Sequence, residues 1–161
     1  MADTLQRKFT QFLFTFFILN FAFFILNSSA HAATLADNSN GTVTDSKTGL
    51  VWQQGEPGAK VWGDALTYCE GLSLGGATDW RLPNIEELES LTDDARYNPA
   101  IDTTYFPNAI ASNYWSSTTD AFNPDGAWGV AFGYGGVGGY AKFSSFYAGA
   151  CVADSLDHLV L

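Results

Sequence analysis

Histidine, on which most proton-transfer catalysis and many zinc sites depend, is nearly absent from this chain. Of the two histidines, His31 lies next to a hydrophobic N-terminal segment and His158 lies in the last four residues. Serine and cysteine nucleophiles usually need a histidine base, and zinc sites need histidine or cysteine ligands. We therefore expect no catalytic residue, no metal site and no cofactor.

Carboxylates are the alternative source of chemistry, because the chain contains 17 Asp and Glu residues. Two carboxyl groups at a suitable distance can hydrolyse a glycosidic bond. Nothing in the sequence singles out such a pair. Glu86, Glu87 and Glu89 crowd the start of an expected helix, where negative charge stabilises the helix dipole. A carboxylate-based hydrolase is thus the alternative to a non-catalytic domain.

Aromatic side chains are the second group that could contact a ligand. The five tryptophans lie in periodic segments, and we expect them in the core because a small domain needs large apolar groups. Phe122, Tyr134 and Tyr140 instead flank expected loops. Exposed rings there would stack on a sugar or seat a peptide, or else shield the edge of the core.

The N-terminus has the three parts of a secretion signal. Arg7 and Lys8 precede an apolar run from Phe12 to Leu26, and Ala30-His31-Ala32 is a small-x-small cleavage site. The alternative is an uncleaved anchor, for which the run is short, since a spanning helix needs about 20 apolar residues. We therefore expect residues 1–32 to be a cleaved signal peptide and the rest to be periplasmic, surface-exposed or secreted, without membrane insertion.

Removal of this signal leaves a strongly acidic domain. Without Asp3, Arg7 and Lys8 the remainder has 16 acidic and 5 basic side chains, a formal charge of −11. A field of this sign repels polyanions, which argues against nucleic acid and anionic lipid as partners. The sequence carries no signal for an oligomeric state.

The two cysteines, Cys69 and Cys151, both lie in the exported part. In an oxidising compartment such a pair usually forms a disulfide. The bond would close a long loop and stabilise the folded state by about 4 to 5 kcal/mol, because it lowers the chain entropy of the unfolded state. Two free thiols or a metal pair are the alternatives, but the cysteines are too far apart for finger-type metal spacing.

We expect an α+β fold for the domain that holds these residues, with the helices first and a meander of antiparallel strands after them. Turn residues separate strands at 42–44 and 50–52, which predicts an N-terminal hairpin. Apolar residues from Trp62 to Leu72 have helical period, with Cys69 on the buried face and Gly75-Gly76 at the end. Asn84 and Glu87 form a capping box that begins a second helix.

Strands dominate the C-terminal part of the chain. Residues 114–119 and 127–134 are expected strands around a loop at 120–126. We expect the glycine-rich run 135–139 to be a hairpin connection. Residues 140–145 then pair back, and 146–152 form the last strand.

Five stretches of the sequence resemble a known bacterial family. They are Asp45-x-x-Thr48-Gly49-Leu50-x-Trp52, Trp62-x-x-Ala65-x-x-Tyr68-Cys69, Asp79-Trp80-Arg81-Leu82-Pro83-Asn84-x-x-Glu87-Leu88, Tyr114-Trp115-Ser116-Ser117-Thr118 and Ala127-Trp128-x-Val130-x-Phe132. In this order they resemble the C-terminal domain of the Legionella collagen-like adhesin. The resemblance covers about residues 40–152.

The resemblance implies a C-type-lectin-like fold, in which a cysteine of the first helix bonds to one of the last strand. Cys69 and Cys151 are expected at those places. The chain departs from the family near its end, where Ala150 and Ala153 stand in place of arginines. The adhesin is associated with sulfated polysaccharides, but a charge of −11 favours a neutral glycan or a protein surface.

Many lectins bind sugar through a calcium ion. Calcium needs six to eight oxygen ligands, and the lectin signature pairs Glu-Pro-Asn or Gln-Pro-Asp with Trp-Asn-Asp. Asn123-Pro124-Asp125 lies in a suitable loop, but Trp-Asn-Asp is absent. We therefore expect a plain turn and no metal there.

The sequence thus predicts a signal at 1–32, a flexible lead-in at 33–40, a C-type-lectin-like domain at 41–153 and a divergent tail at 154–161. Its function is expected to be non-catalytic binding or adhesion. Ligand contacts are expected from Phe122, Asn123, Asp125, Tyr134 and Tyr140. A hydrolase on the same scaffold and a purely structural envelope domain are the alternatives.

Overall fold

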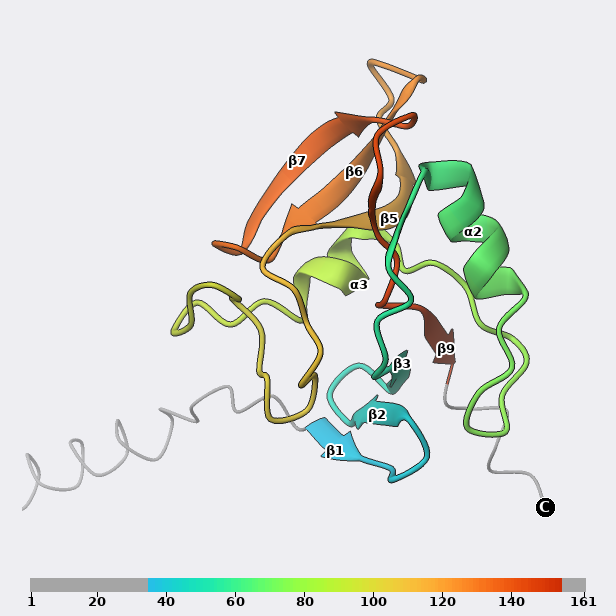
Figure 1. Cartoon of the computed structure of the whole chain (residues 1–161), viewed down its shortest axis with the longest axis vertical. Helices are drawn as coiled ribbons and strands as arrows, with labels where there is room; N and C mark the ends of the chain where they lie inside the picture. Colours follow the sequence, from blue (N-terminus) through green and yellow to red (C-terminus); the bar gives the residue numbers. More distant parts are fainter. Residues whose placement is uncertain (1–34, 155–161) are drawn as a thin grey trace, which may run out of the picture. The chain divides into compact units, whose positions relative to one another are not determined.

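The computed structural model of the chain describes residues 35–154 (Figure 1). The expected signal peptide, residues 33–34 of the lead-in and all of the tail except Asp154 lie outside these residues. Two short helices and two sheets make up the described part, which confirms the α+β class.

The first sheet joins the two ends of the described chain. Its strand order is β1-β2-β3-β9, with all pairs antiparallel. The strands are β1 (Leu35–Asp37), β2 (Thr42–Asp45), β3 (Leu50–Gln53) and β9 (Val152–Asp154). The turn from β2 to β3 is closed by Asp45, whose carboxylate accepts from the Lys47 N–H and the Thr48 hydroxyl. The predicted hairpin is thus confirmed.

The second sheet has the order β4-β8-β5-β6-β7. Its strands are β4 (Ala59–Lys60), β5 (Asn113–Thr119), β6 (Gly126–Ala131), β7 (Gly136–Ala141) and β8 (Phe146–Tyr147). Neighbours pair antiparallel except β5 and β8, which are parallel. β7 forms one edge, as the outermost orange arrow in Figure 1 shows.

The two predicted helices are both present. Helix α2 (Trp62–Glu70) buries Ala65 and Cys69. Helix α3 (Ile85–Glu89) begins at Asn84, whose side chain accepts from the Glu87 N–H while the Glu87 carboxylate accepts from the Asn84 N–H. The capping box predicted from the sequence is therefore confirmed.

Two hydrophobic clusters hold the sheets and helices together. One gathers Trp52, Leu88, Tyr114 and Phe132 between α3 and both sheets. The other surrounds α2 and includes Trp80 and Trp115. Trp52, Trp80 and Trp115 are buried, as expected, whereas Trp62 and Trp128 are half-buried.

Several expectations about the strands were wrong. The glycine-rich run is mostly strand β7, not a connection, and β7 ends at Ala141, so residues 142–145 do not belong to the expected strand 140–145. The turn lies at residues 132–135, where Gly135 has a φ of 81°. Residues 146–152 do not form one strand, because β8 and β9 belong to different sheets. Residues 35–37 were expected to be a flexible lead-in but form strand β1. They pair with β2 across the turn at residues 38–41.

Helix α2 ends earlier than predicted, at Glu70 with Gly71 as its C-cap, rather than at Gly75-Gly76.

Candidate functional site

The two faces of the second sheet differ in what covers them. Residues that stand opposite each other in antiparallel strands point to the same face. Tyr114, opposite Val130, points to the face that packs against α3 and the first cluster. Trp115, opposite Gly129 and thus in line with Gly138, points to the other face. Among the described residues, helix α2 packs on this second face at β5, near Trp115, whereas the outer part over β6 and β7 is accessible at Tyr134.

The open part of the second face carries five residues that we call the tyrosine face. They are Asn113, Tyr134, Gly136, Gly138 and Tyr140. The Tyr134 ring lies against Gly136, where a Cβ atom would overlap it, and the Tyr140 hydroxyl lies 3.0 Å from where a Cβ on Gly138 would stand. The glycines are therefore the floor on which the two rings rest.

Tyr140 packs against two other rings at the inner side of this face. Its ring packs edge-on against Trp115, at 6.3 Å between centroids, and against Phe146 at 4.8 Å. Its hydroxyl lies 3.5 Å from the Asn113 side-chain oxygen. Burial raises the pKa of Tyr140, and the neighbouring Tyr134 hydroxyl raises it further. The hydroxyls of both tyrosines and the amide of Asn113 thus form one polar group.

Tyr134 is the accessible part of the tyrosine face. Its side chain is 67% exposed, although one side of the ring rests on Gly136. No member of the tyrosine face carries a charge. An uncharged aromatic ring beside hydroxyl and amide groups can stack on a sugar ring and exchange hydrogen bonds with its hydroxyls.

Three other predicted contact residues lie elsewhere, in the loop 120–125, which we call the tip loop. Phe122, within this loop, is 99% exposed. Its N–H donates to the Asp120 carboxylate at 2.9 Å. Asn123 and Asp125 are also exposed. The tip loop precedes β6 and Tyr134 follows it, so these residues and Tyr134 lie beyond opposite ends of that strand.

The tip loop is tied down by Lys142. Its ammonium donates to the Pro124 carbonyl at 2.9 Å and to the Thr119 hydroxyl at 3.1 Å, and it lies 4.1 Å from the centre of the Trp62 ring. The Lys142 ammonium thus already bonds two oxygens at this loop that could otherwise serve as cation ligands. Between residues 35 and 154 there is no group of three or more His, Cys, Asp or Glu side chains able to hold a metal.

The predicted disulfide is present. Cys69 of α2 and Cys151, one residue before β9, are bonded, with their Cα atoms 5.5 Å apart. Arg81 forms ion pairs: its guanidinium donates to both oxygens of Glu87 at 2.7 and 2.8 Å and contacts Asp154 at 3.3 Å. Both links join the region of the helices to the C-terminal strand.

Residues 41–153 match the Lcl C-terminal domain, which is well over half of the chain. The chain belongs to the Lcl C-terminal domain family. Among curated proteins, none matches this chain. In the part of this Lcl C-terminal domain that the structure describes, no helix has the length and hydrophobicity needed to span a bilayer.

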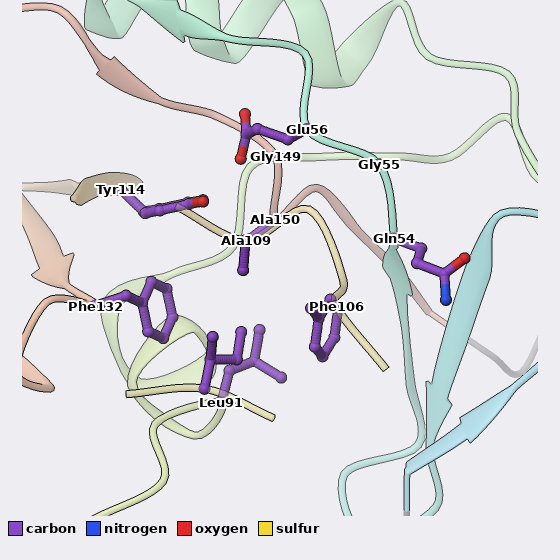
Figure 2. Close-up of a pocket in the computed structure, with 11 residues that line it drawn as sticks. Gln54, Gly55, Glu56, Leu91, Phe106, Ala109, Tyr114, Phe132, Gly149 and Ala150 are labelled. Carbon is purple, nitrogen blue, oxygen red and sulfur yellow. The ribbon is translucent and has the colours of Figure 1, made fainter. Parts of the chain in front are cut away.

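An internal pocket of the Lcl C-terminal domain contains a carboxyl group that the sequence analysis did not single out (Figure 2). Glu56 and Tyr114 lie at one end of the pocket, and Leu91, Phe106 and Phe132 lie at the other. Its volume of about 20 Å³ has room for about one water molecule. Glu56 is the only carboxylate that lines it, so the pocket does not offer the pair that a glycosidase needs.

Burial raises the pKa of Glu56. Hydrogen bonds from the Tyr114 hydroxyl and the Gly58 N–H, together with the charge of Lys60, oppose this shift but are smaller. Tyr114 in turn accepts from the Ile110 N–H at 2.9 Å. The Glu56 carboxyl packs directly on Gly149, where any Cβ would overlap it. This arrangement fixes the connection between the two sheets.

Three members of the tyrosine face were not predicted as contacts, namely Gly136, Gly138 and Asn113, and of these only Asn113 has a polar side chain. It comes one residue before the predicted strand, and nothing in its neighbourhood marks it as a ligand contact. Its position follows from the register between β5, β6 and β7, which a single sequence does not contain.

Proposed function

We propose that this chain is an exported, non-catalytic binding module with a C-type-lectin-like fold, and that its tyrosine face binds a neutral glycan. The observation that carries the proposal is the exposed Tyr134 ring on a glycine floor, beside Tyr140 and Asn113. This combination of one accessible ring and fixed polar groups suits a pyranose, which has an apolar side and a rim of hydroxyls.

The disulfide supports the C-type-lectin-like fold. It joins the first predicted helix, α2, to the residue that precedes the last described strand, β9. This is the connection expected from the family resemblance. Export is supported by the residues of the N-terminal segment and by a cysteine pair that is bonded rather than free.

The neutral character of the ligand follows from charge. No residue of the tyrosine face is charged, and the domain after residue 32 has 16 acidic against 5 basic side chains. Two of the five bases, Arg81 and Arg96, are engaged in ion pairs. A sulfated or otherwise polyanionic chain would meet repulsion without a basic cluster to hold it.

A glycan panel tests this function. Residues 33–161 would be purified from an oxidising compartment and screened against neutral and sulfated glycans and matrix proteins, with calcium and with chelator. Saturable binding to a neutral glycan without product formation supports the proposal. Release of sugar would favour a hydrolase, selective binding to sulfated chains would refute the charge argument, and silence across the panel would favour a structural role.

A further inference from the structure

Among the strands that the structure describes, none pairs with the outer edge of β7. The direction of the backbone groups of β7 follows from its register with β6. The Phe132 N–H donates to the Ser112 carbonyl, so residue 132 points toward β5. Along a strand, N–H and C=O groups alternate between the two sides. Residues 127, 129 and 131 of β6 therefore point toward β7, where they meet Tyr140, Gly138 and Gly136.

The same alternation turns Val137 and Gly139 outward, away from β6. Among residues 35–154 no backbone group bonds to either residue on this outer side. Gly139 is exposed, and Val137 is 39% exposed. Two donor and acceptor pairs thus stand free, two residues apart, which is the spacing at which a further strand would bond to them.

This edge lacks most of the features that keep sheet edges from pairing. From Gly136 to Ala141 there is no proline and no charged side chain, and the six pairs with β6 run without a bulge. Natural proteins usually blunt an edge with one of these devices or cover it. An uncovered edge of this kind is the surface used in recognition by strand addition.

Charge decides which strand fits. The Asp120 carboxylate lies 3.5 Å from where a Cβ on Gly139 would stand, so the edge carries a negative group beside its free backbone groups. A second copy pairing antiparallel about Gly139 would bring two Asp120 carboxylates together in an already acidic domain. A strand with lysine or arginine opposite Gly139 would instead gain an ion pair.

We propose that the outer edge of β7 binds an extended polypeptide segment that carries a basic residue, through strand addition at Val137 and Gly139. This site goes beyond the glycan proposal and uses the edge of β7 rather than its tyrosine face. Main-chain hydrogen bonds supply the attachment, and Asp120 selects the sign of the partner's charge.

The test uses the whole domain after residue 32, labelled with nitrogen-15, and a blocked peptide of sequence Val-Thr-Val-Lys-Val-Thr-Val. The expected result is saturable shifts of the Val137 and Gly139 amide signals, with slowed hydrogen exchange at both. A peptide with Glu in place of Lys is expected to bind at least tenfold more weakly. Methylation of the peptide nitrogens on the bonding edge abolishes binding, whereas methylation on the opposite edge leaves it intact.

Two protein variants separate backbone from charge. Val137→Pro removes an N–H that does not bond to β6, so the variant is expected to fold but to lose peptide binding. The control Val137→Thr is expected to retain the fold and peptide binding. Asp120→Asn keeps an acceptor for the Phe122 N–H and is expected to erase the preference for Lys over Glu, while Asp125→Asn, at an exposed neighbour, preserves it.

Three outcomes would overturn the inference. One is the absence of shifts at Val137 and Gly139 at millimolar peptide. Another is equal binding of the Lys and Glu peptides by the unchanged domain. The third is a concentration-dependent dimer, seen by sedimentation, that protects the same two amides, because the edge would then belong to a second copy. None of these readouts depends on glycan binding.

Discussion

Both oxygens of the Glu87 carboxylate are held by the Arg81 guanidinium, at 2.7 and 2.8 Å, while one of the two oxygens also accepts from the Asn84 N–H at 2.8 Å. A single carboxylate thus begins helix α3 and ties it to Arg81. The backbone of Arg81 in turn exchanges two hydrogen bonds with Val152 of β9. Glu87 therefore links the start of a helix to the last described strand.

Glu87→Gln is expected to destabilise the domain by about 1 kcal/mol at pH 7, because the amide can still cap the helix but loses the charged pair. Arg81 holds the pKa of Glu87 below its usual range. That stabilisation is present above the unfolded pKa and is lost as pH falls through the folded pKa. Urea denaturation between pH 3 and 7 measures it, with Glu89→Gln, at an exposed position, as the control.

Glu56 is expected to have the opposite dependence on pH. Its pKa is raised, chiefly by burial, so the folded state holds the proton more tightly than the unfolded state does. Its favourable contribution is fully present below the unfolded pKa and is lost as pH rises through the folded pKa.

Glu56→Gln should therefore be more stable than the parent at pH 7, since the amide can accept from the Tyr114 hydroxyl without a buried charge. The difference should shrink as pH falls below the unfolded pKa. Thermal denaturation at pH 4 and pH 7 tests this. Equal destabilisation of Glu56→Gln at pH 4 and pH 7 would contradict the claim that the buried negative charge of Glu56 lowers the stability of the domain.

The disulfide should dominate the stability of the domain. It joins positions 82 residues apart, and chain entropy assigns such a loop about 4 to 5 kcal/mol. The double variant Cys69→Ala, Cys151→Ala should lower the free energy of unfolding by up to that amount. Urea denaturation of the variant, compared with reduced parent protein, gives the measurement; a loss below about 1 kcal/mol would contradict the entropic argument.

The tip loop should be indifferent to calcium, because the Lys142 ammonium already occupies the Pro124 carbonyl and the Thr119 hydroxyl. Addition of 5 mM calcium, roughly a saturating level for extracellular sites, should leave the melting temperature unchanged. Lys142→Met should lower that temperature by loosening the loop. An increase in melting temperature with calcium in the unchanged domain would show that a metal competes with the lysine.

Local features of the fold were predictable from the sequence because their signals lie within a few residues. The capping box of Asn84 and Glu87 is one, and the hairpin closed by Asp45 is another. The cysteine pair was predictable for a different reason, since two cysteines have one possible pairing.

Pairing between distant strands was not predictable. The glycines of β7 imply a turn when considered alone, yet each lies opposite a residue of β6 that fixes it in a strand. The division of residues 146–154 between two sheets, and the approach of Asn113 to Tyr140, depend on the same long-range register. Of the five predicted contact residues, the structure brings together Tyr134 and Tyr140 and places the other three in the tip loop.

The most direct test of the glycan proposal is titration calorimetry of Tyr134→Ala with the neutral glycan selected by the panel. Phe143→Ala is the matched control, because Phe143 is 83% exposed but follows β7 at the end far from Tyr134. The account predicts a loss of affinity of about tenfold or more for Tyr134→Ala, equivalent to about 1.4 kcal/mol, and none for Phe143→Ala. Unchanged affinity in Tyr134→Ala would contradict it.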